Sequence, residues 1–226
     1  DGCGVPQASR ASLAAPHATS KISNFDDIYN DAPSLGFRGE ALYSLANISE
    51  TLVIATRTKD DNLAQKMEFA RDGSLVPESI VEMPRTVGTT VAVIGFFKVL
   101  PVRRRIFEQR IQYFRSKLVE MMTGYAIFST GVRINLMDMG AQGREKSLLA
   151  TTFNNSSLRD TVSSVLGTKF LSTMSEFEVD LTAIVSTEEA EAGKWKVSGL
   201  LCTASTGKNK GQYFAINRRP VLAVQG

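Results

Sequence analysis

The chain has 226 residues and few of the side chains on which most metal sites are built. It contains one histidine, His17, and two cysteines, Cys3 and Cys202. A two-histidine zinc site and a Cys/His cluster are therefore excluded, and any bound metal ion would have oxygen ligands. Two distant cysteines do not form a disulfide framework, which favours a reducing compartment. Cys3 lies between two glycines with no base nearby in the sequence, so we expect it to be a small buried thiol.

Long hydrophobic runs are also absent. No apolar stretch approaches the roughly 20 residues that span a bilayer, and no signal peptide opens the chain, so we expect no membrane association. The Gly207-Lys208 pair lacks the first glycine and the final Ser/Thr of a P-loop. The net charge is only +3. Nucleic-acid binding would therefore depend on local clusters such as Arg103 to Arg105, although charge runs are usually solvated faces.

The hydrophobic pattern predicts a mixed α+β protein. Residues 1 to about 35 contain several prolines, serines and threonines and are expected to form a loop or lid. Asp72-Gly73 predicts a hairpin turn. Apolar and β-branched periodicity predicts helices at 39–48 and 104–129 and strands at 52–58, 66–69, 89–94, 132–136 and 147–151.

A polar stretch at residues 152–157 is the predicted domain junction, which gives domains 1–153 and 154–226. After it the hydrophobic pattern begins again. The expected elements are a helix at 158–166 that Gly167 ends, and strands at 177–185, 195–202 and 212–217.

The stretch Gly36 to Leu42, which reads GFRGEAL, is suited to holding phosphate. Gly36 and Gly39 allow close backbone approach, Arg38 carries a fixed positive charge, and the amides from Gly39 onward become the unpaired donors of a helix N-terminus. The same residues also fit a capped turn before a core helix, because glycine-rich turns before helices are common. The surrounding motifs decide between these alternatives.

Several motifs, in order, resemble the N-terminal region of the MutL/PMS DNA mismatch-repair ATPases, which belong to the GHKL superfamily. They are Gly2-Cys3-Gly4-Val5, HATSKI at 17–22, GFRGEAL at 36–42, Gly88-Thr89-Thr90-Val91, LPVR at 100–103 and FAINRRP at 214–220. The LPVR and INRRP segments are similar to those of the PMS-type eukaryotic subunit. The resemblance implies a GHKL-type α/β sandwich, a mixed sheet layered with helices. A ribosomal-S5-like α/β domain would follow.

The resemblance also implies a site for ATP and Mg²⁺. Gly2 and Gly4 would approach the adenine, with Val5 below it, and Thr89 would contact the adenine region or simply pack within its strand. Hydroxyls and an ammonium at 19–21 would meet phosphate oxygens from a mobile lid. Glu40 would have a structural role beside amides that bind phosphate. The implied cofactor-binding residues are Asp1, Gly2, Gly4, Thr19, Ser20, Lys21, Arg38, Gly39, Glu40, Ala41, Leu42 and Thr89.

Some groups of the family site lie beyond this sequence. In the family, a glutamate that acts as general base and an asparagine that ligates magnesium precede the position of Asp1, and a lysine follows the INRRP-like motif. We therefore expect the chain by itself to hydrolyse ATP poorly or not at all. The family segment Asp-Asn-Gly-x-Gly leaves two registers open: Asp1 stands at the asparagine position, or it is the adenine-binding aspartate.

The implied role is ATP-dependent lid closure, N-terminal dimerisation and DNA binding without sequence preference. Its implied partners are double-stranded DNA, a paralogous MutL-type subunit in a heterodimer and a MutS-type mismatch-recognition complex, in the nucleus. The alternative is a non-catalytic nucleotide-sensing or DNA-binding assembly module. The DNA-binding candidates are Lys194, Lys196, Lys208, Lys210, Arg218 and Arg219.

Overall fold

The computed structural model describes residues 2–20, 35–36, 38–140, 143–152, 155–180, 196–202 and 211–221. The chain forms two compact units, Asp1–Ile111 and Gln112–Gly226. The domain boundary expected from the sequence, between residues 153 and 154, lies within the second unit and stays a prediction. Within the described ranges, no helix has the length and apolar character to cross a membrane.

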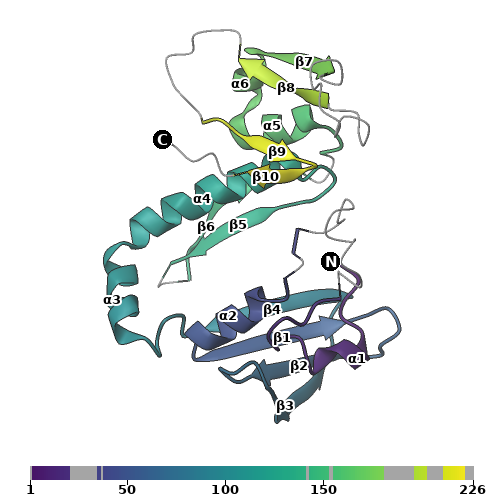
Figure 1. The fold of residues 1–226 in the computed structure, drawn as a ribbon, viewed down its shortest axis with the longest axis vertical. Coiled ribbons are helices and arrows are strands. Elements are labelled where there is room, and N and C mark those ends of the chain that lie inside the picture. The colour runs from purple at the N-terminus through teal and green to yellow at the C-terminus, as the bar shows by residue number, and fades with distance from the viewer. Residues whose placement is uncertain are drawn as a thin grey trace, which may run out of the picture. The chain divides into compact units, whose positions relative to one another are not determined.

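A four-stranded antiparallel sheet organises the first unit, with strand order β3-β2-β1-β4 (Figure 1). Each expected strand is present within a few residues of its predicted bounds, and the helix predicted at 39–48 begins two residues later. The elements are α1 (Gln7–Arg10), α2 (Ala41–Ile48), β1 (Thr51–Arg57), β2 (Ala64–Phe69), β3 (Leu75–Met83), β4 (Gly88–Ile94) and α3 (Pro101–Gln109).

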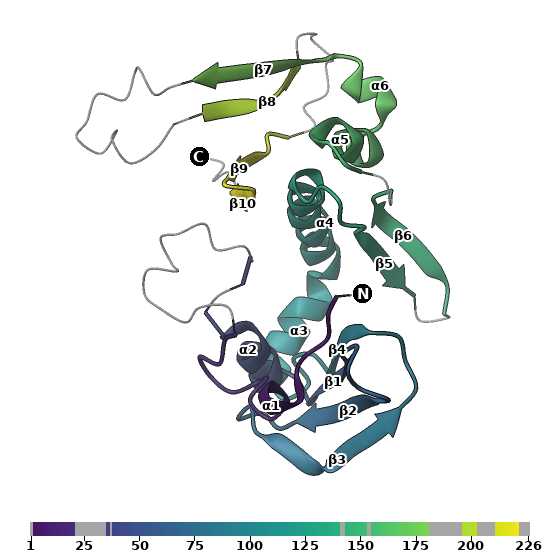
Figure 2. The same cartoon turned by 90° about the vertical axis from the view of Figure 1, so that its right-hand side faces the viewer.

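The core of this unit lies on one face of the sheet, which α2 covers (Figure 2). Side chains alternate between the two faces of a strand, so Leu52 and Ile54 of β1 point to the same side as Met67 and Phe69 of β2. All four are almost fully buried, together with Ala46 of α2. Partly buried neighbours of this cluster are Leu13, Leu42, Leu45, Leu75 and Val93.

The predicted hairpin turn at Asp72-Gly73 is confirmed and joins β2 to β3. Gly73 has a φ of 80°, the left-handed conformation that glycine adopts without steric cost. Its amide donates to the Ala70 carbonyl at 2.9 Å. The side chain of Asp72 accepts from the hydroxyl and the amide of Ser74, and these bonds lower the pKa of Asp72.

The single helix predicted at 104–129 is wrong, because the chain forms two helices there. These are α3 (Pro101–Gln109) and α4 (Ile111–Phe128). Pro101 occupies the first turn of α3, where its fixed φ suits a helix start. Arg110 then leaves helical geometry with φ −111° and ψ 21°. Apolar spacing continues across this break, so periodicity alone does not reveal it.

In its described residues, the second unit contains α4 except for its first residue, together with three two-stranded sheets and two further helices (Figure 1). The helix predicted at 158–166 is confirmed as α5. Ser157 and Asp160 form a capping box at its start, and Gly167 follows it with φ 93°. The other elements are β5 (Asn135–Met139), β6 (Glu145–Ala150), α5 (Leu158–Leu166), α6 (Thr168–Leu171), β7 (Met174–Asp180), β8 (Lys196–Cys202), β9 (Phe214–Ile216) and β10 (Arg219–Val221).

Two strand predictions in this unit need correction. The strand expected at 132–136 begins at Asn135, because the Val132 carbonyl accepts from two side chains, Asn155 Nδ2 at 3.1 Å and Thr151 Oγ1 at 3.2 Å, rather than from a strand amide. The strand expected at 212–217 is a hairpin of β9 and β10. Asn217 and Arg218 form its turn with φ values of 48° and 63°, as a two-residue hairpin turn requires. The part of the 177–185 strand beyond Asp180 lies outside the described residues.

Candidate functional site

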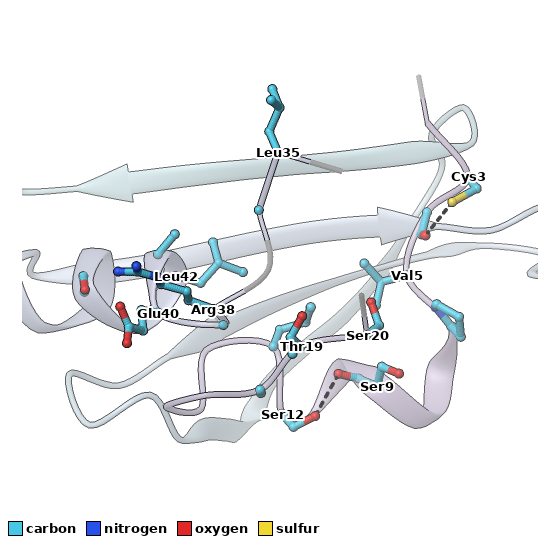
Figure 3. Close-up of a pocket in the computed structure, with 18 residues that line it drawn as sticks. Cys3, Val5, Ser9, Ser12, Thr19, Ser20, Leu35, Arg38, Glu40 and Leu42 are labelled. Atoms are coloured by element: carbon cyan, nitrogen blue, oxygen red, sulfur yellow. Dashed lines mark hydrogen bonds between the residues drawn. The ribbon is translucent and has the colours of Figure 1, made fainter. Parts of the chain in front are cut away.

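The first unit contains a cavity of about 1140 Å³ between its N-terminal segment and the start of α2 (Figure 3). Cys3 and Val5 lie at one end of it, and Arg38, Glu40 and Leu42 at the other. The segment with Thr19 and Ser20 lies between them. Three stretches that are separate in the sequence therefore form one pocket. Its lining includes Cys3 to Pro6, Ser9, Ser12, Leu13, Ala18 to Ser20, Leu35, Gly36, Arg38 to Leu42 and Ser44.

Most of the predicted cofactor-binding residues line this pocket: Gly4, Thr19, Ser20, Arg38, Gly39, Glu40, Ala41 and Leu42. Gly2 and Thr89 are described but are not among its lining residues. Asp1 and Lys21 lie outside the described residues. The pocket thus unites the described parts of HATSKI and GFRGEAL, while the assignment of individual ligand contacts stays a prediction.

The two motifs meet at Gly39. This glycine has a φ of 66°, and a Cβ placed on it would overlap the Ala18 carbonyl oxygen and lie 2.6 Å from the carbonyl carbon of His17. Only glycine allows two backbones to approach this closely. His17 itself has a φ of 62°, and its Nδ1 lies 3.8 Å from Glu40 Oε1. Gly39 therefore holds the start of α2 directly against the HATSKI segment.

The N-terminus of α2 faces the pocket with its first amides uncapped by a side chain. Glu40 is the N-cap residue, and its own side chain makes no capping hydrogen bond. The first helical bond runs from the Ser44 amide to the Glu40 carbonyl at 2.9 Å. The amides before Ser44 in this helix therefore have no acceptor within the helix itself, and the helix dipole favours negative charge beside them. Ala41 and Leu42 belong to this group and line the pocket.

The opposite end of the pocket is built on β1 and β4. Gly4 has a φ of 76°, and a Cβ on it would overlap the Arg57 carbonyl at the end of β1. The Val5 amide donates to Thr56 Oγ1 at 2.8 Å, and the same oxygen lies 2.9 Å from Thr89 Oγ1. Thr89 thus connects to the pocket wall through Thr56. Its expected contact with adenine stays a prediction.

Cys3 is not the buried thiol expected from the sequence. It is exposed at the pocket, and its Sγ donates to the Gly4 carbonyl at 3.5 Å. The glycines on either side explain the difference, because they supply no side chains to cover the thiol.

Sequence reasoning missed Arg10, which anchors the pocket wall from behind. Its side chain is almost fully buried and donates from Nε to the Val5 carbonyl at 3.0 Å and from Nη1 to Gln65 Oε1 at 3.0 Å. Nη2 forms an ion pair with Asp61. Asp61 accepts from the Thr58 amide and hydroxyl at 2.7 Å each; these bonds, followed by the Arg10 contact, lower its pKa to about 2. Nothing in the local sequence distinguishes Arg10 from an exposed loop arginine.

The DNA-binding candidates of the second unit have different surroundings. Lys196 Nζ lies 2.6 Å from Glu178 Oε1, because the β7–β8 register places both on one face of that hairpin. Arg218 is in the β9–β10 turn and Arg219 begins β10. Lys194, Lys208 and Lys210 lie outside the described residues. DNA binding by these side chains stays a prediction.

Known proteins resemble the chain over almost its full length. It is 34% identical to the mismatch repair endonuclease pms1 of Dictyostelium discoideum, over 92% of this chain and 19% of that protein. Other PMS- and MutL-named mismatch-repair proteins match in the same way. The chain spans 19% to 26% of the length of the first eukaryotic relatives it matches. No protein-family model matches the chain.

Two solved structures share the fold. The N-terminal domain of a DNA repair protein superposes with a TM-score of 0.77 at 29% identity, over 98% of this chain and 63% of that one. The MutL ATPase domain of Aquifex aeolicus in complex with ADP gives a TM-score of 0.57 at 23% identity, over 89% of this chain and 67% of that one. The predicted α+β fold class is confirmed. Over almost its whole length, the chain is thus similar to part of the PMS- and MutL-named DNA mismatch-repair proteins and to the N-terminal domain of a DNA repair protein.

Proposed function

We propose that the first unit binds ATP, with the phosphates at the Arg38–Leu42 end of the pocket and the adenosine at the Gly4–Val5 end. The observation that carries the proposal is the close approach of Gly39 to His17 and Ala18, which brings the lid segment and the start of α2 into one pocket. Uncapped helix amides beside an arginine match the charge and donor pattern that phosphate needs. The ADP complex of the Aquifex protein, which shares the fold, supports the nucleotide class.

Magnesium would enter as the counter-ion of the ATP phosphates. Among the described residues no group of three or more His, Cys, Asp or Glu side chains could hold a metal ion. The described part of the pocket therefore does not form a metal cage of its own.

ATP binding can be measured directly by titration calorimetry on the protein. Arg38→Gln should weaken ATP affinity about tenfold, because one charge-assisted hydrogen bond is worth about 1.5 kcal/mol or more. Arg144→Gln in the second unit removes the same charge from an exposed position and is the matched control. It should leave the affinity unchanged. Equal ATP affinity in the wild type and Arg38→Gln would contradict the phosphate assignment.

The wider role that we propose follows from the relatives. The parent protein would couple ATP binding and hydrolysis to lid closure, to association with a MutL-type partner and to mismatch repair in the nucleus with a MutS-type complex. The competing role is a nucleotide-sensing assembly module with little hydrolysis. Steady-state ATP turnover by the full-length protein distinguishes the two roles.

DNA binding is the other part of this proposal, and it should depend on salt. We expect Lys196, Arg218 and Arg219 each to contact one phosphate. With three such contacts, raising the salt concentration from about 50 to 200 mM should lower the affinity for duplex DNA about 40-fold. Glu178→Gln releases Lys196 from its ion pair and should tighten binding, whereas Arg218→Gln should weaken it. Fluorescence anisotropy with a labelled duplex measures both. Affinity that does not change with salt would exclude phosphate-directed binding.

A further inference from the structure

Buried side chains hold the Val5 backbone on both sides. Thr56 Oγ1 accepts from the Val5 amide at 2.8 Å, and Arg10 Nε donates to the Val5 carbonyl at 3.0 Å. Thr56 has no exposed surface and Arg10 has 3%. Neither residue lines the pocket, whereas Gly4 and Val5 do. The pocket wall is therefore fixed from behind by two side chains that a ligand would not touch.

The Thr56 hydroxyl has enough hydrogen-bonding capacity for all of its neighbours. Besides the Val5 amide, it lies 3.3 Å from the Gly88 carbonyl and 2.9 Å from Thr89 Oγ1. One hydroxyl offers one proton and two lone pairs. It can donate to Gly88 while accepting from Val5 and Thr89. This single oxygen joins the N-terminal segment to both β1 and β4.

Arg10 connects the other side of Val5 to the sheet. Its guanidinium reaches Gln65 of β2 through Nη1 and Asp61 of the β1–β2 loop through Nη2. The planar group is therefore held at three nitrogens, which fixes the direction of the Nε donor. Gly4 completes the arrangement, since its backbone packs against the end of β1 with no room for a Cβ.

We propose that Thr56 and Arg10 are positioning residues for nucleotide binding, which set the Gly4–Val5 wall against which the adenosine end docks. This inference rests on the proposed ATP site. It assigns the two residues to the adenosine end of the ligand. Their loss should therefore weaken ATP binding without weakening the binding of the phosphates alone.

The test uses Thr56→Val, which keeps the shape and removes the hydroxyl, and Thr56→Ser, which keeps the hydroxyl. A fluorescent ATP analogue is displaced from each variant by ATP and, separately, by inorganic tripolyphosphate. We expect Thr56→Val to weaken ATP about tenfold and Thr56→Ser by less than about twofold. Tripolyphosphate should compete equally well in all three proteins. Arg10→Lys keeps the positive charge but loses the planar set of guanidinium donors. Its ATP affinity should therefore fall as in Thr56→Val.

Thr161→Val is the matched control for loss of a buried hydroxyl. Thr161 also has no exposed surface, and its hydroxyl donates to the Ile127 carbonyl at 2.6 Å in the second unit. The melting temperature of the Thr161→Val variant should fall as in Thr56→Val, whereas its ATP affinity should stay unchanged. Wild-type ATP affinity in Thr56→Val, equal losses in the valine and serine variants, or a parallel loss of tripolyphosphate would each overturn the inference. A wild-type protein that binds no ATP would instead refute the proposed function.

Discussion

Replacing Gly39 by alanine is expected to lower ATP affinity about 100-fold. The new Cβ would overlap the Ala18 carbonyl oxygen and lie 2.6 Å from the carbonyl carbon of His17, so one of the two segments must move. Either movement separates the lid from the first amides of α2. Loss of two charge-assisted hydrogen bonds to phosphate, at about 1.5 kcal/mol each, gives this factor. Titration calorimetry with ATP measures it.

Gly131→Ala provides the control for backbone strain. Gly131 has a φ of 74°, close to the 66° of Gly39, but a Cβ on it would have no heavy atom within 4 Å. Both variants therefore carry the cost of a left-handed alanine, about 1 kcal/mol, and only Gly39→Ala creates the overlap. Gly131→Ala should bind ATP as the wild type does. Equal affinity in the two variants would show that the Gly39 contact does not shape the site.

Replacing Arg10 by alanine is expected to destabilise the first unit by at least about 2 kcal/mol. Two of its buried hydrogen bonds go to neutral acceptors, the Val5 carbonyl and Gln65 Oε1, and each contributes about 1 kcal/mol net. Asp61 also loses its ion-pair partner. Urea unfolding measures the change. Lys98→Ala is the control, because Lys98 and Glu50 form an exposed pair that should contribute less than about 1 kcal/mol.

The same cluster predicts how stability changes in acid. The amide and hydroxyl of Thr58, and then Arg10, lower the pKa of Asp61 from 3.8 to about 2. The ionised carboxylate therefore contributes stability above pH 3.8, and this contribution is lost as the pH falls through about 2. The difference in unfolding free energy between the wild type and Asp61→Asn should be largest at neutral pH. It should shrink as the pH falls from 3.8 to about 2. A difference that is constant down to pH 2 would contradict the assignment.

Many local elements could be predicted from the sequence because their signals are short-range. Asp72-Gly73 selects a hairpin turn, and the helical spacing of apolar residues up to Gly167 predicts α5. The break at Arg110 was missed because apolar spacing passes through it unchanged. The β9–β10 turn was missed because Asn217-Arg218 lacks the glycine that usually marks such turns.

By itself, the sequence determined the α+β class, the order of the motifs and the family resemblance, since these depend on periodicity and on residues close together in the chain. Only the tertiary structure decided how the pocket is built. Gly39 meets Ala18, Thr56 holds Val5, and Arg10 is buried among three acceptors. Apart from the bond between Arg10 and Val5, these contacts join residues that lie far apart in the sequence. No local pattern encodes them, because burial and hydrogen-bond partners are fixed only when the sheet and the N-terminal segment pack together.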